Sequence, residues 1–73
     1  MVMVAFDSTH FARVLKSRRE LKGWDQETLA KESGVSRNAI ARYETELNVP
    51  GFETVCKLAA ALGCSTDEFV KEA

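Results

Sequence analysis

Three side chains that can form directed hydrogen bonds occur close together in the chain, at Arg37, Asn38 and Arg42. An arginine guanidinium can donate two bonds to O6 and N7 of guanine, and an asparagine amide can pair with N6 and N7 of adenine. On a helix that buries Ile40 and Tyr43, these three side chains point outward. The pattern therefore indicates side chains able to contact base edges of DNA.

The residues before them predict how such a helix is held. Residues 26–33 form a first short helix, and Gly34 then supplies a residue that takes positive φ without steric cost. Val35 can be buried in the turn, and Ser36 is a good N-cap for a second helix over 37–44. Two short helices around a tight turn, the second carrying Arg and Asn, are typical of a DNA-binding helix-turn-helix.

A plainer interpretation of the same residues stays open at this point. Arg37 and Arg42 would then form an ordinary solvated helix face, which is where most arginines lie. Composition does not decide between the two, because the 73 residues have a net charge of only −1. Residues 1–43 carry eight Lys and Arg against five Asp and Glu, and residues 44–73 carry two against six. The basic first part could face phosphates, although a random surface mixture fits equally well.

The rest of the chain predicts an all-α fold, a compact five-helix bundle with short connections. The first helix runs over 8–22, with Asp7 or Ser8 as its cap and Gly23 as its stop. Its apolar positions at helical spacing are Phe11, Val14, Leu15 and Leu21, and Trp24 is expected to fold back onto the core.

Two further helices complete this bundle. One covers 52–62, and Ser65 and Glu68 form a capping box that opens a last helix through Phe69 and Val70. The composition, 45% apolar and 29% charged, is that of one small folded domain.

The chain begins with an apolar run over residues 1–6, which is far too short to span a membrane. We divide the chain into an N-terminal arm, 1–7, and a helix-turn-helix domain, 8–73. The arm either packs over the helices or serves as a dimerisation arm. A dimer surface is otherwise expected at four apolar residues: Leu47, Val49, Phe69 and Val70.

The sequence offers little to an enzyme, a metal ion or a cofactor. It has no Ser/His/Asp or Cys/His grouping, no metal-ligand spacing and no phosphate loop. Cys56 and Cys64 are expected to be reduced thiols, and His10 to have a surface or cap role. We therefore expect no catalytic residues, no bound metal and no cofactor.

Several short motifs, in order, resemble the phage-repressor (XRE) type of helix-turn-helix domain, and the likeness covers roughly residues 8–70. The motifs are WDQETLA at 24–30, SGVS at 33–36, Ile40 with Tyr43-Glu44, PGFET at 50–54 and LAAALGCS at 58–65. This resemblance implies a lambda-repressor-like bundle in which the helix over 37–44 enters the major groove.

The resemblance also implies roles for individual residues. Those that meet base edges are Arg37, Asn38 and Arg42. Those expected at DNA phosphates are Gln26, Ser36 and Thr45; for Gln26 the reason is that free N–H groups and the helix dipole favour an anion there. Arg19 and Glu44 match an internal ion pair that joins the first helix to the end of the third.

The sequence departs from the family in the loop over 45–49. This loop has no Lys or Arg, and it has Glu46 where the family commonly has Gly. Asp25 also brings negative charge close to an expected phosphate. Both departures predict a modest affinity for DNA.

The expected function is a sequence-specific transcriptional regulator that binds double-stranded DNA as a homodimer on a palindromic site. Half-sites would lie roughly 34 Å apart, and the protein would be cytoplasmic, in a prokaryote or encoded by a phage. The alternative is a protein-interaction module of the antirepressor or antitoxin type, with weak or no DNA binding. The acidic, apolar loop over 45–49 favours that alternative.

Overall fold

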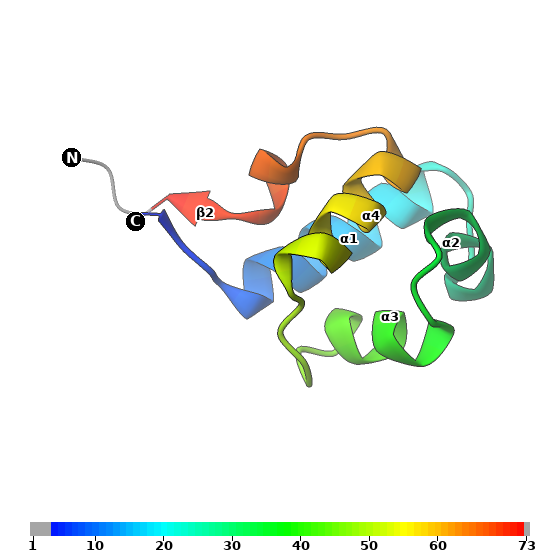
Figure 1. The fold of residues 1–73 in the computed structure, drawn as a ribbon, viewed down its shortest axis with the longest axis horizontal. Coiled ribbons are helices and arrows are strands. Elements are labelled where there is room, and N and C mark those ends of the chain that lie inside the picture. The colour runs from blue at the N-terminus through cyan, green and yellow to red at the C-terminus, as the bar shows by residue number, and fades with distance from the viewer. Residues whose placement is uncertain (1–3, 73) are drawn as a thin grey trace.

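In the described part of the chain, four helices enclose the core, and a short ribbon joins the two ends of that part (Figure 1). The computed structural model describes residues 4–72, so residues 1–3 of the expected arm lie outside it. In chain order the elements are β1 (Val4–Ala5), α1 (Ser8–Leu21), α2 (Gln26–Ser33), α3 (Arg37–Glu44), α4 (Phe52–Leu62), the 3-10 turn η1 (Thr66–Phe69) and β2 (Lys71–Glu72).

Local capping explains where these helices begin. The side chain of Asp7, not that of Ser8, caps α1 by accepting from the N–H groups of Thr9 and His10 at 2.9 and 3.1 Å. Ser36 caps α3 by accepting from the Ala39 N–H at 3.1 Å. Between α2 and α3, Gly34 has a φ of 76°, a left-handed conformation that favours glycine and turns the chain sharply.

The core gathers one or more apolar side chains from every helix. Phe11 lies at its centre, with its ring centroid 5.8 Å from that of Tyr43 and 5.2 Å from that of Phe69. The buried cluster comprises Phe11, Leu15, Leu29, Val35, Ile40, Tyr43, Val55, Leu58, Ala59, Leu62 and Phe69. Trp24 packs against this cluster, as the sequence predicts.

The expected fifth helix is only one turn of 3-10 helix, so the five-helix count is wrong. Ser65 caps it through a bond from the Asp67 N–H at 3.2 Å, but the Glu68 carboxylate contacts Arg18 of α1 instead of completing the capping box. Val70 then takes an extended conformation, with φ −112° and ψ 147°, which ends the turn. Packing against α1 therefore overrides the local tendency to continue a helix.

Two apolar residues lie elsewhere than expected. Leu21, predicted in the core, is 77% exposed, because it lies about 120° around the helix from the buried Leu15. Phe69, predicted on a dimer surface, is 0% exposed because η1 folds it inward against Phe11. Phe69 is therefore a core residue and cannot contact a second subunit.

An ion pair inside the helix assembly links three helices. Arg19 of α1 donates to both carboxylate oxygens of Glu44 in α3, from Nε at 2.8 Å and from Nη2 at 2.9 Å. A third donor, Nη1, reaches the Trp24 carbonyl at 2.8 Å, and Gln26 Nε2 donates to Glu44 Oε1 at 3.1 Å. The two charged side chains are only 11% and 5% exposed, and the hydrogen bond to Glu44 raises the pKa of Arg19. This network orients α1, α2 and α3 together.

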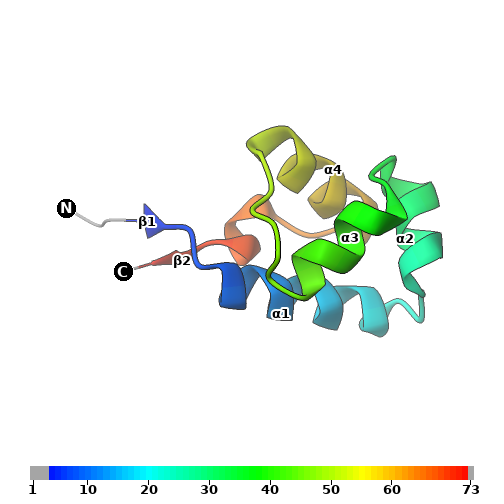
Figure 2. The same cartoon turned by 90° about the horizontal axis from the view of Figure 1, so that it is seen from below.

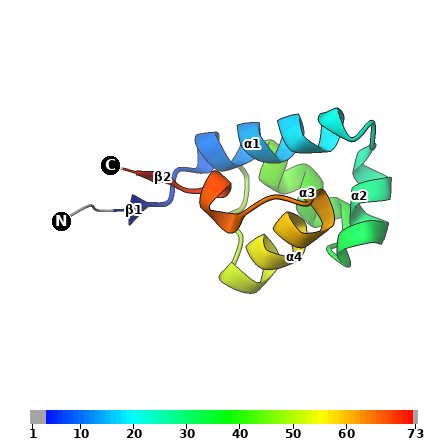
Figure 3. The same ribbon diagram turned by 90° about the horizontal axis from the view of Figure 1, so that it is seen from above.

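The two ends of the described chain meet in an antiparallel ribbon, with Val4 opposite Glu72 and Ala5 opposite Lys71. Figure 3 shows this ribbon projecting from the end of the helix assembly at which α1 begins. Between residues 4 and 72, none of the helices is long and apolar enough to cross a membrane.

Two phenylalanines provide a matched test of this packing. Replacing the buried Phe69 by alanine should lower the free energy of unfolding by about 3–5 kcal/mol, because it leaves a cavity beside Phe11. Replacing Phe52, which is 78% exposed, should change the free energy of unfolding of the monomer, measured at low protein concentration, by less than about 0.5 kcal/mol. Urea denaturation followed by circular dichroism measures both, and equal losses would contradict the assignment of Phe69 to the core.

Candidate nucleic-acid interface

Helix α3 lies uncovered on one side of the molecule (Figure 2). It buries Ile40 and Tyr43, while Arg37, Asn38 and Arg42 are exposed. Asn38 and Arg42 are one turn apart and share one strip of the helix surface. The structure thus brings the three predicted base-contacting residues onto one accessible helix.

Ser36 lies at the N-terminus of this helix, where phosphate binding is favoured by free N–H groups and by the helix dipole. Its Oγ accepts from the Ala39 N–H, as an N-cap does. The hydroxyl hydrogen is a separate donor, so the side chain can cap the helix and donate to an anion at the same time.

A hollow of about 280 Å³ separates the first turns of α2 and α3, and its lining residues are Arg19, Asp25, Gln26, Glu27 and Arg37. Gln26, predicted at a phosphate, thus lies close to Arg37, predicted at a base. One N–H of the Gln26 amide is bound to Glu44, which leaves the second N–H as a donor. The backbone N–H groups of Gln26 and Glu27, in the first turn of α2, also lack acceptors within the helix. The hollow therefore offers several donors to an anion.

Asp25 opposes an anion at this place. Its Oδ1 accepts from the Thr28 N–H at 2.7 Å, so the carboxylate caps α2. That hydrogen bond lowers the pKa of Asp25, and the group is charged at neutral pH. A phosphate entering the hollow would therefore meet a negative charge at its edge.

Thr45 is the predicted phosphate contact that the geometry supports least. Its hydroxyl donates to the Ala41 carbonyl at 2.9 Å and also lies 3.2 Å from the Arg42 carbonyl. These bonds cap the C-terminal end of α3, where the dipole disfavours anions. The Thr45 hydroxyl could donate to a phosphate only after its hydrogen bond to the Ala41 carbonyl breaks.

The loop after α3 contains a left-handed residue that is not glycine. Glu46 has a φ of 64°, the Leu47 N–H donates to the Arg42 carbonyl at 2.8 Å, and the Glu46 N–H donates to that of Tyr43 at 3.2 Å. These bonds form the Schellman motif that commonly has glycine at this position. The Thr9 hydroxyl donates to Glu46 at 2.7 Å, which also holds the loop against α1.

The loop also folds back onto the exposed face of α3, which the sequence did not predict. The Asn48 amide satisfies both its groups when its nitrogen donates to the Leu47 carbonyl at 2.8 Å. In that orientation its oxygen accepts from Arg42 Nε at 3.0 Å. No residue spacing signals this contact, because it depends on the left-handed turn at Glu46.

The remaining reactive groups lie on α1, on α4 and between α4 and η1. Cys56 and Cys64 are both free, and partial burial raises the pKa of the Cys64 thiol. The His10 ring lies 3.0 Å from the Glu68 carbonyl and so joins α1 to η1. Within residues 4–72, no three His, Cys, Asp or Glu side chains are grouped so that they could hold a metal ion.

The chain is similar to known proteins along most of its length. A family model described as "Helix-turn-helix" matches residues 15–69. The SPbeta prophage-derived uncharacterized HTH-type transcriptional regulator YonR of Bacillus subtilis (strain 168) is 36% identical over 61 residues. Those residues are 84% of this chain and 56% of YonR, so the chain spans about half the length of this curated relative.

Several solved structures share the fold, among them the following two. The restriction-modification controller protein C.AhdI from Aeromonas hydrophila matches with a TM-score of 0.82 and 33% identity, over 86% of this chain and 96% of C.AhdI. The P22 c2 repressor, solved with synthetic operator 9T, matches with a TM-score of 0.78 and 33% identity, over 84% of this chain and 92% of the repressor chain. The lambda-repressor-like fold is confirmed.

The family match covers well over half of the chain and includes α2, Gly34 and α3. It also agrees with the exposed Arg and Asn side chains of α3 and with the buried faces of both helices. This protein therefore belongs to the helix-turn-helix family.

Proposed function

We propose that this chain is a sequence-specific DNA-binding transcriptional regulator that acts by binding alone, without catalysis. The observation that carries this proposal is the set of three hydrogen-bonding side chains, Arg37, Asn38 and Arg42, exposed on an uncovered helix. Such a helix fits the major groove, where Arg selects guanine and Asn selects adenine. The similar P22 c2 repressor, solved with a synthetic operator, supports this function.

The phosphate backbone would be held at the helix N-termini beside this surface. Gln26 and the first-turn N–H groups of α2 would bind one phosphate in the hollow next to Arg37. Ser36 would bind another, while Thr45 would contribute only after its hydroxyl leaves Ala41. Phosphate contacts fix the register of the protein on DNA, and the base contacts then give specificity.

The active form in this proposal is a homodimer on a palindromic site, in the cytoplasm of a prokaryotic cell. A single small module makes few contacts, and a two-fold operator matches two copies whose α3 helices lie one DNA turn apart. The loop over 45–49 leads from the end of α3 directly to α4. A two-fold axis beside this loop would place both copies of α3 on the same side of the DNA.

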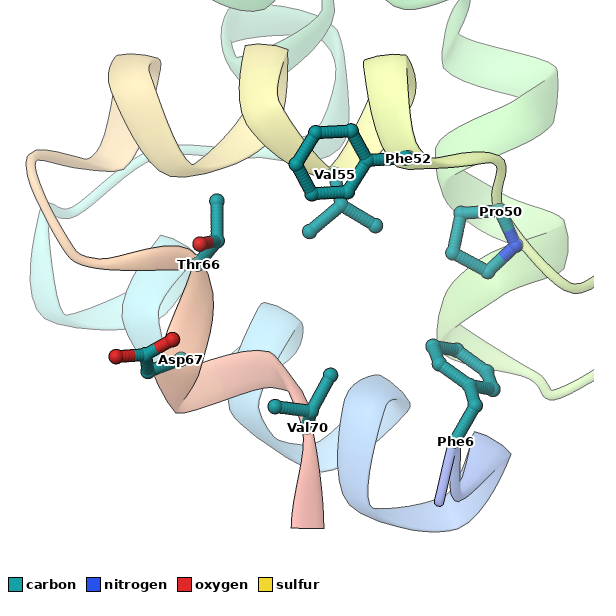
Figure 4. Close-up of a pocket in the computed structure, with 7 residues that line it drawn as sticks. All are labelled: Phe6, Pro50, Phe52, Val55, Thr66, Asp67 and Val70. Carbon is teal, nitrogen blue, oxygen red and sulfur yellow. The ribbon is translucent and has the colours of Figure 1, made fainter. Parts of the chain in front are cut away.

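An apolar hollow next to this loop is the surface we assign to the second copy. It measures about 330 Å³ and is lined by Phe6, Pro50, Phe52, Val55, Thr66, Asp67 and Val70 (Figure 4). Phe52 and the neighbouring Val49 are exposed, as is Leu47. Exposed apolar side chains gathered in this way are typical of an interaction surface.

The same loop supports one alternative, a protein-interaction module with weak or no DNA binding. Glu46, Leu47 and Val49 present an acidic and apolar surface, in a loop that has no Lys or Arg. Under this alternative the partner is another protein, and α3 remains unbound.

Selection of bound duplexes from a random DNA pool tests the two functions directly. A regulator should select a palindromic sequence, and its affinity should fall linearly in a log–log plot as salt rises, because phosphate contacts release counterions. Sites without symmetry would contradict the dimer, and absence of binding even at low salt would support the protein-interaction module.

Two alanine substitutions distinguish a residue that contacts a base from one that contacts a phosphate. Arg37→Ala should weaken binding to the selected site by about 1–3 kcal/mol and relax the preference at one base position. Gln26→Ala, as the matched phosphate variant, should weaken all duplexes alike and leave the salt slope nearly unchanged, because a neutral amide releases no counterion. Fluorescence anisotropy with single-base operator variants measures both, and an equal loss on every sequence for Arg37→Ala would make Arg37 a phosphate contact.

Removing the charge of Asp25 should strengthen DNA binding, whereas Arg37→Ala and Gln26→Ala should weaken it. Asp25→Asn keeps an equally good N-cap but removes the negative charge beside the hollow, so DNA affinity should rise by about twofold at about 0.15 M salt. The control is Glu32→Gln, an exposed residue at the other end of α2, roughly 10 Å away and largely screened. An equal gain from both substitutions would indicate a general charge effect and not a phosphate at the start of α2.

A further inference from the structure

The contact between Asn48 and Arg42 links the loop to the exposed surface of α3. With the Asn48 amide nitrogen on the Leu47 carbonyl, the amide oxygen accepts from Arg42 Nε at 3.0 Å. In the opposite orientation, the Asn48 amide oxygen would face the Leu47 carbonyl and the amide nitrogen would face the Arg42 guanidinium. Neither group of the amide would then form a hydrogen bond. The hydrogen-bonding groups themselves therefore select the orientation.

This bond limits how Arg42 can approach a base. A guanidinium has five N–H donors and can present either the edge with Nε or the end formed by Nη1 and Nη2. Because Asn48 occupies the Nε hydrogen, only the Nη end remains for a pair of bonds to guanine O6 and N7. We propose that Asn48 is a positioning residue that presents Arg42 end-on to one guanine, a role that rests on the proposed DNA-binding function.

The loop geometry explains why Asn48 can hold this position. The Leu47 N–H is bound to the Arg42 carbonyl, so the backbone just before Asn48 is fixed to the residue whose side chain it contacts. The left-handed Glu46, bound to Thr9 of α1, makes this return of the chain possible. Asn48 is therefore placed by backbone contacts that do not depend on DNA.

Holding the side chain in advance has an energetic consequence. A free arginine loses side-chain rotamer entropy when it is fixed on a base. A side chain already oriented by Asn48 loses less of this on binding, and its orientation favours one base over others. Asn48 thus affects discrimination at the base under Arg42 without contacting DNA itself.

The hydrogen bond can be tested in the protein without DNA. In 15N NMR spectra, the Arg42 Nε–H should exchange with water more slowly than that of the exposed Arg13. Asn48→Ala should remove this difference, because no side-chain acceptor then remains for the Arg42 Nε–H. An Arg42 signal that exchanges as fast as Arg13 in the unmodified protein would overturn the proposal.

The effect on specificity is tested by a double-mutant cycle on the selected operator and on its variants at each base pair. Asn48→Ala should reduce discrimination at the base pair under Arg42 by about fivefold, the usual size of coupling between contacting residues. It should have no further effect in the Arg42→Ala background.

Two results distinguish this inference from the proposed function. If the unmodified protein binds no duplex, the regulator function fails, while the NMR measurement still decides whether Asn48 holds Arg42. If the protein binds its operator and Arg42→Ala loses discrimination, but Asn48→Ala does not, Asn48 has no positioning role. Unchanged thermal melting of Asn48→Ala is expected, because the residue is exposed, and confirms that the variant is folded.

Discussion

The ion pair between Arg19 and Glu44 is the contact on which the arrangement of the three N-terminal helices depends. Each charge is almost excluded from water, so removing either partner would leave the other uncompensated at a cost of several kcal/mol. The same two side chains bind the Trp24 carbonyl and the Gln26 amide. One pair therefore fixes the end of α3, the turn after α1 and the first residue of α2, and the exposed surface of α3 takes its orientation from them.

The surface that this network presents is poor in positive charge. Arg37 and Arg42 are exposed there, but Asp25 caps α2 at one side and Glu46 begins the loop at the other. Long-range attraction to DNA is therefore weak, and the proposed binding depends on directed hydrogen bonds. Orientation of each side chain then matters more than total charge, which is why the contact of Asn48 with Arg42 has consequences for specificity.

The C-terminal part of the chain contains one buried phenylalanine and one exposed phenylalanine, which have different roles. Phe69 of η1 is buried and completes the core beside Phe11, while Phe52 at the start of α4 is left exposed next to an apolar hollow. The contacts of Arg18 with Glu68 and of His10 with its carbonyl hold η1 on α1. Because η1 is held there, an apolar hollow lies between it and α4.

The sequence alone determined the helix-turn-helix, since Gly34, the Ser36 cap and the apolar spacing are local signals that the tertiary structure leaves unchanged. The resemblance to a family then indicated the partners Arg19 and Glu44, which are far apart in the chain. Only the tertiary structure decided that Phe69 is buried, that Leu21 is exposed and that the last helix is one 3-10 turn. It also decided that Asn48 meets Arg42. These features depend on which elements pack against one another and on a left-handed turn at a glutamate, and neither leaves a periodic pattern in the residues.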